Sequence, residues 1–409
     1  MDLRSAMEIV KPKNFLEEIR HDEVVDFLKK NACLNEPVLL NVEGKKVAKN
    51  FVSSRELLSK LLGVEKQKLA QYLSEIERRP PNLEFRSFDD MGLKRMNLDL
   101  QELPVLRYFP ADGGRYVTGG VVISKGRFVN ASIHRMMLLN SKQFAVRLVP
   151  PRHTYILWKE AVENGEELRA AVAIGVHPLF LLAAATRVAE GEEFNYASKL
   201  LGKLIVYEKN GIPVPPAEIV LFGRFLDERT KEGPFLDITG TYDDIREEPI
   251  LEIDEVYARK DYIYYSITPS LKEHQILMGV PYEPVIYKFV SNVCRVKNVV
   301  MTPGSFHYFH CVVQIKKLSE GDAKNAILAA LAANPSMKGV IVVDEDIDIT
   351  NYEDIEFAIA TRFQADKDLI VVSGTRVSSL DPSAGLTGAK WGIDATKPLD
   401  GKGFDRVRV

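Results

Sequence analysis

The chain has 409 residues, a length that favours two or three domains. Its apolar content of 46% and charged content of 27% are those of a globular protein, and a formal net charge of −3 gives no reason to expect a nucleic-acid partner. The three cysteines form no CxxC pair, which argues against a zinc finger or a disulfide scaffold and favours a reducing compartment. Residues 1–15 contain acidic side chains and no apolar core, unlike a signal peptide, so we expect a cytoplasmic protein.

The N-terminal region, residues 1–105, is predicted to be α/β and mostly helical. Apolar side chains at three- and four-residue spacing predict an amphipathic helix over residues 15–30, and a short strand is expected at 37–42. Two further helices are expected at 53–63 and 64–79. We expect this region to provide packing and assembly surface, because its residue pattern indicates no chemistry.

The central region, residues 106–282, is rich in predicted strands. Residues 128–134 and 144–149 are expected to form a strand pair, followed by a helix from His153. This density of strands suggests a barrel-like sheet with helices inserted.

One apolar run, residues 168–188, nearly reaches the length of a membrane span. It is interrupted by His177 and by Pro178, a residue suited to the first position of a helix. We therefore predict a buried strand, a turn and a buried helix, and no membrane span.

The C-terminal region, residues 283–409, alternates strands with helices, as a layered α/β domain does. Its glycine-rich segment at residues 379–398 is expected to be loop. The acidic run at residues 344–348 either binds a cation, forms a solvated loop or belongs to an ion-pair set at an interface.

No phosphate loop, GxGxxG fingerprint, GxSxG elbow or HExxH motif is present, so a site must be assembled from separated residues. Asn130, His153 and Glu193 offer an amide oxygen, an imidazole and a carboxylate, a set that suits Mn²⁺ or Mg²⁺. A hydrogen-bonded trio without metal is the alternative. Glu232 and Asp237 flank a Gly-Pro bend, where two close acids can act as a proton donor and its partner, or form an exposed acidic turn.

Six motifs in order resemble the UbiD family of decarboxylases, which use prenylated flavin mononucleotide (FMN). They are N-x-S-I-x-R at 130–135, P-x-H at 151–153, E-[FY] at 193–194, P-x-A-E-I-V-L-x-G at 215–223, E-G-P-[FY]-x-[DE]-x-T-G at 232–240 and K-x-G-[IL]-D-A-T at 390–396. The sequence departs from the common pattern at Leu236, where the family often has glycine. The resemblance implies an α/β (α+β) fold in which a central split β-barrel binds the flavin, between an N-terminal helical α/β region and a C-terminal layered α/β domain that serves in oligomerisation.

The resemblance also implies roles for the matched residues. A divalent ion, Mn²⁺ or Mg²⁺, would bridge its three ligands to the flavin phosphate, with K⁺ beside it. The implied metal ligands are Asn130, His153 and Glu193, and the same three contact the cofactor with Ile133, His134, Arg135, Arg147 and Leu148. The implied catalytic residues are Arg135, Glu232 and Asp237, with Asp237 as the acid that protonates the carbon left by carbon dioxide while the flavin serves as electron sink.

The expected function is non-oxidative decarboxylation of an α,β-unsaturated acid. The short form of the chain resembles the branch that converts trans-anhydromevalonate 5-phosphate to isopentenyl phosphate in isoprenoid synthesis. Lys272 and His274 would then face the substrate phosphate, unless they belong to a solvated loop. The alternatives are a 4-hydroxybenzoate or polyprenyl-hydroxybenzoate decarboxylase, a non-catalytic flavin- or metal-binding subunit, and an FMN oxidoreductase. A flavin prenyltransferase is the expected cofactor supplier, and the protein is expected to be a homo-oligomer, dimer or hexamer.

Overall fold

The apolar run at residues 168–188 contributes an interior strand to the largest sheet in the computed structural model, which describes residues 1–404. It forms strand β11 (Leu168–Ile174) and helix α6 (Pro178–Ala185), with Pro178 in the first turn and the His177 side chain capping the helix. The predicted strand, turn and helix are therefore confirmed. Within the described residues, no helix is long and apolar enough to cross a membrane.

The chain divides into two units, which are described separately. The N-terminal unit consists of Met1–Gly63 and Arg78–Leu277. The C-terminal unit consists of Val64–Glu77 and the described part of Met278–Val409. The predicted mixed α/β fold is confirmed in both, since each contains sheets or strands together with helices.

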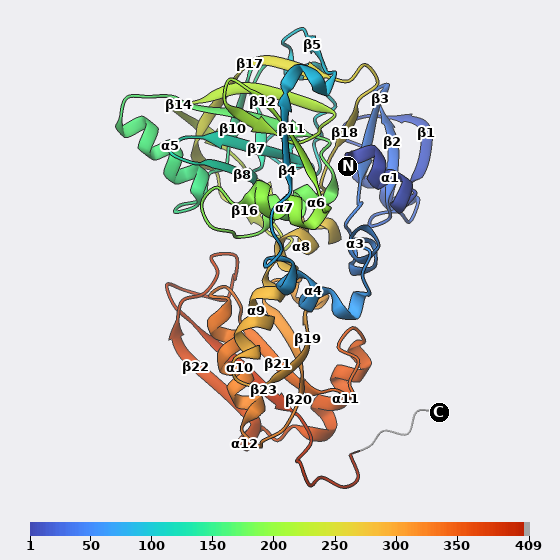
Figure 1. Ribbon diagram of the computed structural model, residues 1–409, viewed down its shortest axis with the longest axis vertical. Helices are drawn as coiled ribbons and strands as arrows, with labels where there is room; N and C mark the ends of the chain where they lie inside the picture. Colours follow the sequence, from blue (N-terminus) through green and yellow to red (C-terminus); the bar gives the residue numbers. More distant parts are fainter. Residues whose placement is uncertain (405–409) are drawn as a thin grey trace. The chain divides into compact units, whose positions relative to one another are not determined.

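The large sheet of the N-terminal unit has its two longest strands, β14 (Ile219–Glu232) and β17 (Arg246–Ala258), side by side (Figure 1). In spatial order its strands are β6 (Tyr116–Val117), β9 (Met136–Leu138), β10 (Gln143–Val146), β17 (Arg246–Ala258), β14 (Ile219–Glu232), β11, β7 (Gly120–Lys125) and β8 (Val129–Ile133), with β5 (Lys94–Met96) beside β17. Within the described chain the end strands β6 and β8 do not pair with each other, as expected of a split rather than a closed barrel.

The two strands that carry the candidate site are not partners, although a strand pair was expected. β8 pairs with β7, whereas β10 pairs with β9 and β17. The segments that follow the two strands do meet, because Arg147 N donates to Arg135 O at 3.2 Å. The polar residues therefore converge from the strand ends, not from one ladder.

Smaller sheets and helices complete the N-terminal unit. The strands are β1 (Lys13–Ile19), β2 (Val38–Val42), β3 (Lys45–Lys49) and β18 (Ile263–Tyr265) in one sheet, β13 (Ile212–Val214), β12 (Leu204–Lys209) and β4 (Leu83–Ser87) in another, and the hairpin β15 (Phe235–Leu236) and β16 (Tyr242–Asp243). The helices are α1 (Leu3–Val10), α2 (Val24–Lys30), α3 (Arg55–Leu62), α5 (His153–Glu163), α6, α7 (Glu193–Leu201), the start of α8 (Lys272–Gly279), and the 3₁₀ turns η2 (Phe88–Met91) and η3 (Leu100–Glu102).

The helix predicted over residues 15–30 was half wrong, because its first half is strand β1. β1 pairs in parallel with β2, and only the second half is helical, as α2. The apolar spacing predicted that Leu16 would lie on the buried face of a helix, but the Leu16 side chain is exposed. Hydrogen bonding to β2 decides the local structure here, as tertiary context often does.

The C-terminal unit is one sheet covered on both faces. Its strands, in spatial order, are β19 (Arg295–Met301), β20 (His310–Lys316), β21 (Gly339–Asp344), β23 (Gly388–Ala395) and β22 (Leu369–Thr375). Its helices are α4 (Leu69–Ile76), α9 (Tyr282–Ser291), α10 (Asp322–Ala333), α11 (Tyr352–Arg362) and α12 (Ala365–Asp368), with the 3₁₀ turns η1 (Lys66–Lys68) and η4 (Pro303–Ser305). Val299 and Val313 pack into one core and their neighbours Val300 and Val312 into another, which explains the near-continuous apolar strands.

The glycine-rich segment at residues 379–398 is not all loop, as was expected. It contains β23, which lies between β21 and β22. A Cβ added at Gly392 would lie 2.1 Å from Ile327 Cγ2, so glycine lets helix α10 approach the strand closely. The glycine marks tight packing in a strand, not chain flexibility.

Candidate active site

Arg135 and Glu232 form a buried ion pair at the centre of the candidate site. Arg135 lies between β8 and β9, and Glu232 ends β14. Arg135 Nε donates to Glu232 Oε1 at 2.9 Å, and Nη2 donates to Oε2 at 2.8 Å. The Glu232 side chain is 0% exposed. Burial alone would lower the pKa of Arg135, but the carboxylates of Glu232 and Asp243 outweigh it and raise that pKa.

Asp237 is carried by the short hairpin β15–β16 that follows Glu232. The chain bends at Gly233, whose φ of +100° lies in the region that favours glycine. Asp237 Oδ2 lies 4.0 Å from Arg135 Nη1, and the Asp237 side chain is 20% exposed. The structure thus brings the three predicted catalytic residues together as an arginine, a buried carboxylate and a carboxylate that solvent or a ligand can reach.

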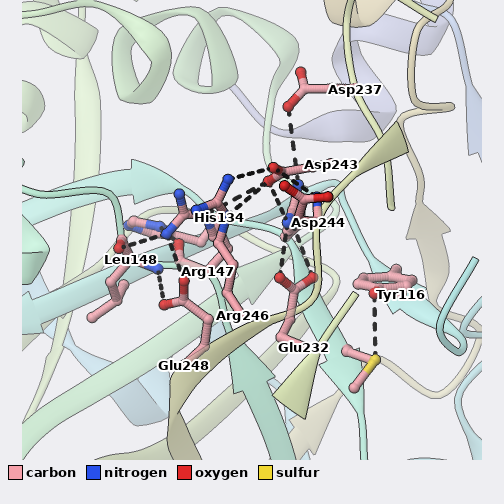
Figure 2. Close-up of polar contacts among 12 residues, drawn as sticks. Tyr116, His134, Arg147, Leu148, Glu232, Asp237, Asp243, Asp244, Arg246 and Glu248 are labelled. Carbon is pink, nitrogen blue, oxygen red and sulfur yellow. Dashed lines mark hydrogen bonds and ion pairs between the residues drawn. The ribbon is translucent and has the colours of Figure 1, made fainter. Parts of the chain in front are cut away.

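Asp243, a residue that the sequence pattern did not single out, also binds Arg135. Arg135 Nη2 donates to Asp243 Oδ2 at 3.0 Å, and Arg246 Nη2 donates to Asp243 Oδ1 at 2.7 Å. Figure 2 shows Glu232, Asp237 and Asp243 grouped around these contacts. Three carboxylates therefore surround one guanidinium, although only two were predicted.

Asn130, His153 and Glu193 converge from three elements. His153 begins α5, Glu193 begins α7, and Asn130 lies on β8. His153 Nδ1 lies 3.2 Å from Asn130 Oδ1 and 3.6 Å from Glu193 Oε1. The hydroxyls of Ser132 and Thr154 each accept a hydrogen bond from Asn130 Nδ2 at 2.9 Å, which turns the Asn130 oxygen toward His153. One nitrogen and two oxygens thus face a common point.

The charge of Glu193 is only partly compensated by the protein. The side chain is buried, and its Oε2 atom has no hydrogen-bond partner. Burial raises the pKa of Glu193 to about 7. A buried orphan carboxylate oxygen beside an amide oxygen and an imidazole fits a divalent cation better than it fits a hydrogen-bonded trio. Among the described residues no three His, Cys, Asp or Glu side chains form such a cluster, and here the third group is an amide.

His134 is buried in a defined tautomer. Its Nδ1 faces the carbonyl oxygen of Arg147 at 2.9 Å and must therefore carry the proton. Its Nε2 accepts from the hydroxyls of Ser132 at 2.8 Å and Thr154 at 3.0 Å. Burial lowers the pKa of His134 to about 4, so the ring is neutral at neutral pH. It holds the two hydroxyls that orient Asn130.

This neutral histidine predicts a pH-dependent stability. Below its ordinary pKa of 6.5, His134 takes up a proton in the unfolded chain but not in the folded one, where the pKa is about 4. The stability it contributes is full above pH 6.5 and is lost as the pH falls toward 4, by about 3 kcal/mol. Denaturant unfolding at pH 7 and pH 4 should show this loss in the wild type and a smaller one in His134→Asn. Equal losses in the two proteins would contradict the assignment.

Arg147 and Leu148 are held by one buried carboxylate that was not predicted. Glu248 Oε1 accepts from Arg147 Nη1 at 2.5 Å, and Glu248 Oε2 accepts from Leu148 N at 3.0 Å. Ile133 ends β8 and is half-buried. Glu248 therefore fixes the backbone and the guanidinium of two of the expected flavin contacts.

Lys272 and His274 lie in the first turn of α8. His274 Nδ1 accepts from Ser270 N at 3.1 Å, and Lys272 Nζ donates to Gln275 Oε1 at 3.3 Å. Burial lowers the pKa of His274, while the charge of Asp237 acts in the opposite direction. Ser270, which donates to His274, also donates through its hydroxyl to Ile238 O at 3.4 Å, so the start of α8 contacts the hairpin that carries Asp237 and is not a solvated loop.

The acidic run at residues 344–348 forms ion pairs. Arg362 binds Asp344 at 2.8 Å and Asp346 at 2.8 Å, and Lys397 lies 3.2 Å from Asp346. The structure supports ion pairing rather than a solvated loop, and these pairs form within the chain.

Two family models match this chain. The 3-octaprenyl-4-hydroxybenzoate carboxy-lyase Rift-related domain (UbiD) matches residues 87–271, and the 3-octaprenyl-4-hydroxybenzoate carboxy-lyase C-terminal domain (UbiD_C) matches residues 275–395. A protein of Archaeoglobus fulgidus named anhydromevalonate phosphate decarboxylase is 64% identical over 408 residues, which cover 100% of this chain and 96% of that protein.

Solved structures are similar along the whole chain. The UbiD-class enzyme HmfF from Pelotomaculum thermopropionicum, in complex with FMN, has a TM-score of 0.94 and 32% identity, covering 100% of this chain and 97% of that one. An evolved dimeric form of HmfF, in complex with prenylated FMN, has a TM-score of 0.90 and 30% identity, with the same coverage.

Proposed function

We infer a decarboxylase activity, because the chain belongs to the UbiD family of carboxy-lyases. The substrate, the cofactor and the roles of individual residues are our proposals. They are supported by the contacts around Arg135 and by the similarity to relatives along the full length of the chain.

The catalytic roles are assigned from the different burial of Glu232 and Asp237. Both oxygens of Glu232 accept from Arg135, and the Glu232 side chain is fully buried, so it is poorly placed to exchange a proton with a substrate. Asp237 Oδ2 lies 4.0 Å from Arg135 and its side chain is partly exposed. Asp237 is therefore the proton donor, and Glu232 orients Arg135 beside it.

The proposed substrate is trans-anhydromevalonate 5-phosphate, in line with the name of the 64% identical relative. The bond between C2 and the carboxylate carbon breaks, carbon dioxide leaves, and Asp237 Oδ2 delivers one proton to C2 to give isopentenyl phosphate. Arg135 is placed to hold the departing carboxylate near Asp237. Solvent then returns the proton to Asp237.

The proposed cofactors are prenylated FMN with Mn²⁺ or Mg²⁺. When bound, the prenylated flavin would supply an electron sink for the bond cleavage. Asn130, His153 and Glu193 would hold the divalent ion beside the flavin phosphate. Ile133, His134, Arg135, Arg147 and Leu148 would contact the flavin. K⁺ beside the metal remains a prediction from the family resemblance.

Loss of one ligand should weaken metal binding strongly. Glu193→Gln removes the only charged ligand, and because even a residue behind a ligand typically costs 10–100-fold in metal affinity, we expect a loss of at least about 100-fold. Mn²⁺ titration followed by electron paramagnetic resonance, with FMN present, measures it. Glu192→Gln removes the neighbouring carboxylate and serves as the matched control. Equal Mn²⁺ affinity in the two variants would rule out the proposed site.

The phosphate end of the substrate is assigned to α8. Lys272 supplies a cation whose side chain bonds to an uncharged partner, Gln275. His274 lies near Asp237 and would face the middle of the substrate as well as its phosphate. A phosphorylated substrate therefore fits this helix better than a neutral isoprenoid tail does.

A flavin prenyltransferase as cofactor supplier, a cytoplasmic location and a homo-oligomeric state, dimer or hexamer, complete the proposal. The oligomeric state can be measured directly by light scattering of the purified protein.

Cofactor dependence tests this function. The protein is purified after co-expression with a flavin prenyltransferase, and separately with FMN alone, and carbon dioxide release is measured with trans-anhydromevalonate 5-phosphate. We expect release only from the first sample. Bound prenylated flavin without turnover on any unsaturated acid would favour a non-catalytic subunit, and NAD(P)H consumption by the FMN sample would favour an oxidoreductase.

A further inference from the structure

Asp243 is a carboxylate shared by three arginines. Its Oδ2 atom accepts from Arg135 Nη2 at 3.0 Å and lies 4.0 Å from Arg147 Nε. Its Oδ1 atom accepts from Arg246 Nη2 at 2.7 Å. The side chain is 16% exposed, so these contacts form in a partly desolvated place where charges act strongly. Burial alone would raise the pKa of Asp243, but Arg246 and Arg135 together lower it.

The hairpin that carries Asp243 also carries the acid. Asp243 pairs with Phe235 across the hairpin, and the Phe235 ring lies 4.8 Å from the Arg135 guanidinium carbon. Both strands of the hairpin therefore contact Arg135, one through a carboxylate and the other through an aromatic face. Phe235 is itself held by the Tyr116 ring, whose centre lies 4.5 Å away.

Asp237 begins the turn of this hairpin. Its backbone N–H donates to Thr241 O at 2.9 Å, and its Oδ1 atom accepts from the backbone N–H of Ile238 at 2.6 Å. The side chain makes no close hydrogen bond to Arg135, since the nearest separation is 4.0 Å. The position of Asp237 is thus set by the hairpin and not by its own ion pair.

We propose that Asp243 is a positioning residue that fastens the hairpin of residues 235–243 to Arg135 and thereby sets the distance between Asp237 and Arg135. The inference rests on the proposed function, in which Asp237 is the proton donor. Figure 2 shows Asp243 close to Asp237 and Glu232, and each of these three carboxylates lies within 4.0 Å of Arg135. Its exposed neighbour Asp244 contributes only a backbone N–H to this group, at 3.0 Å from Asp243 Oδ1.

Hydrogen exchange tests the structural part without any reaction. Peptides covering residues 235–243 are compared in the wild type, Asp243→Asn and Asp244→Asn by mass spectrometry. We expect faster exchange of this segment in Asp243→Asn and unchanged exchange in Asp244→Asn, because only the first loses a charge-assisted bond to Arg135. Equal protection in all three proteins would overturn the proposal even if the decarboxylase assignment stands.

Steady-state kinetics test the catalytic part. Displacing a reacting group slightly can cost up to about 100-fold, so Asp243→Asn should lower kcat about 10–100-fold while KM changes less than about threefold. Asp243→Glu keeps the charge and should recover part of kcat, whereas Asp244→Asn should match the wild type. A variant that changes KM alone, or an Asp243→Glu protein no better than Asp243→Asn, would overturn the positioning role. Inactive wild type would instead point to failure of the proposed function.

Discussion

The variant Asp237→Asn is expected to lose decarboxylation by about 10²–10⁴-fold, the range that a general acid contributes. The amide cannot deliver a proton to C2, while the side-chain volume and the hairpin stay nearly unchanged. FMN and Mn²⁺ binding should match the wild type, because Asp237 is not among the residues assigned to the cofactor. Initial rates of carbon dioxide release, and incorporation of solvent deuterium into the product, measure the loss.

The matched control for this variant is Asp244→Asn, which removes the same charge from an exposed position directly after the hairpin. It should release carbon dioxide at the wild-type rate. Turnover of Asp237→Asn close to that of the control would remove Asp237 from the proton-donor role.

Replacing Arg135 by Met should both abolish turnover and destabilise the fold by about 3–5 kcal/mol, the usual result of leaving a buried charge unpaired. Glu232 is fully buried and both of its oxygens accept from Arg135, so the variant isolates a carboxylate that water cannot reach. Denaturant unfolding at pH 7 measures the change in the free energy of unfolding.

Two further variants show whether the loss of stability comes from the unpaired charge or from lost packing. The double variant Arg135→Met, Glu232→Met removes both charges and should recover most of the stability without any activity. Arg246→Met breaks a more exposed contact to Asp243, since the Arg246 side chain is 42% exposed, and should cost less than about 1 kcal/mol. An Arg135→Met protein as stable as Arg246→Met would contradict a buried pair at the centre of the site.

Several elements and site residues could be predicted from the local sequence alone. The run at residues 168–188 could be divided correctly because proline and histidine interrupt it at a point suited to the start of a helix. Asn130 and His153 were recognised as candidate metal ligands from their side-chain types, and the structure places His153 Nδ1 3.2 Å from Asn130 Oδ1. The three-way convergence with Glu193 needed the ordered family motifs, since spacing along the chain does not reveal it.

The failures have physical causes as well. Strand β1 exists because it hydrogen-bonds to β2, although its apolar spacing suits a helix equally well. Strand β23 contains glycine because α10 lies against it, whereas a glycine-rich sequence by itself predicts a loop. Asp243 and Glu248 lie in a charged stretch whose pattern resembles any solvated turn. Only the placement of Arg135 and Arg147 beside them shows that these two acids belong to the site.

The most direct test of the account is the product formed in deuterium oxide by the wild-type protein loaded with prenylated flavin. With trans-anhydromevalonate 5-phosphate we expect one carbon dioxide per isopentenyl phosphate. A single deuterium is expected on the terminal vinylic carbon of the product, which is C2 of the substrate, and is detected by nuclear magnetic resonance. We also expect kcat/KM at least about 100-fold above that for 4-hydroxybenzoate, because Lys272 and His274 would recognise the phosphate. Preferred turnover of the aromatic acid would contradict the proposed substrate, and product without solvent deuterium would contradict proton delivery by Asp237.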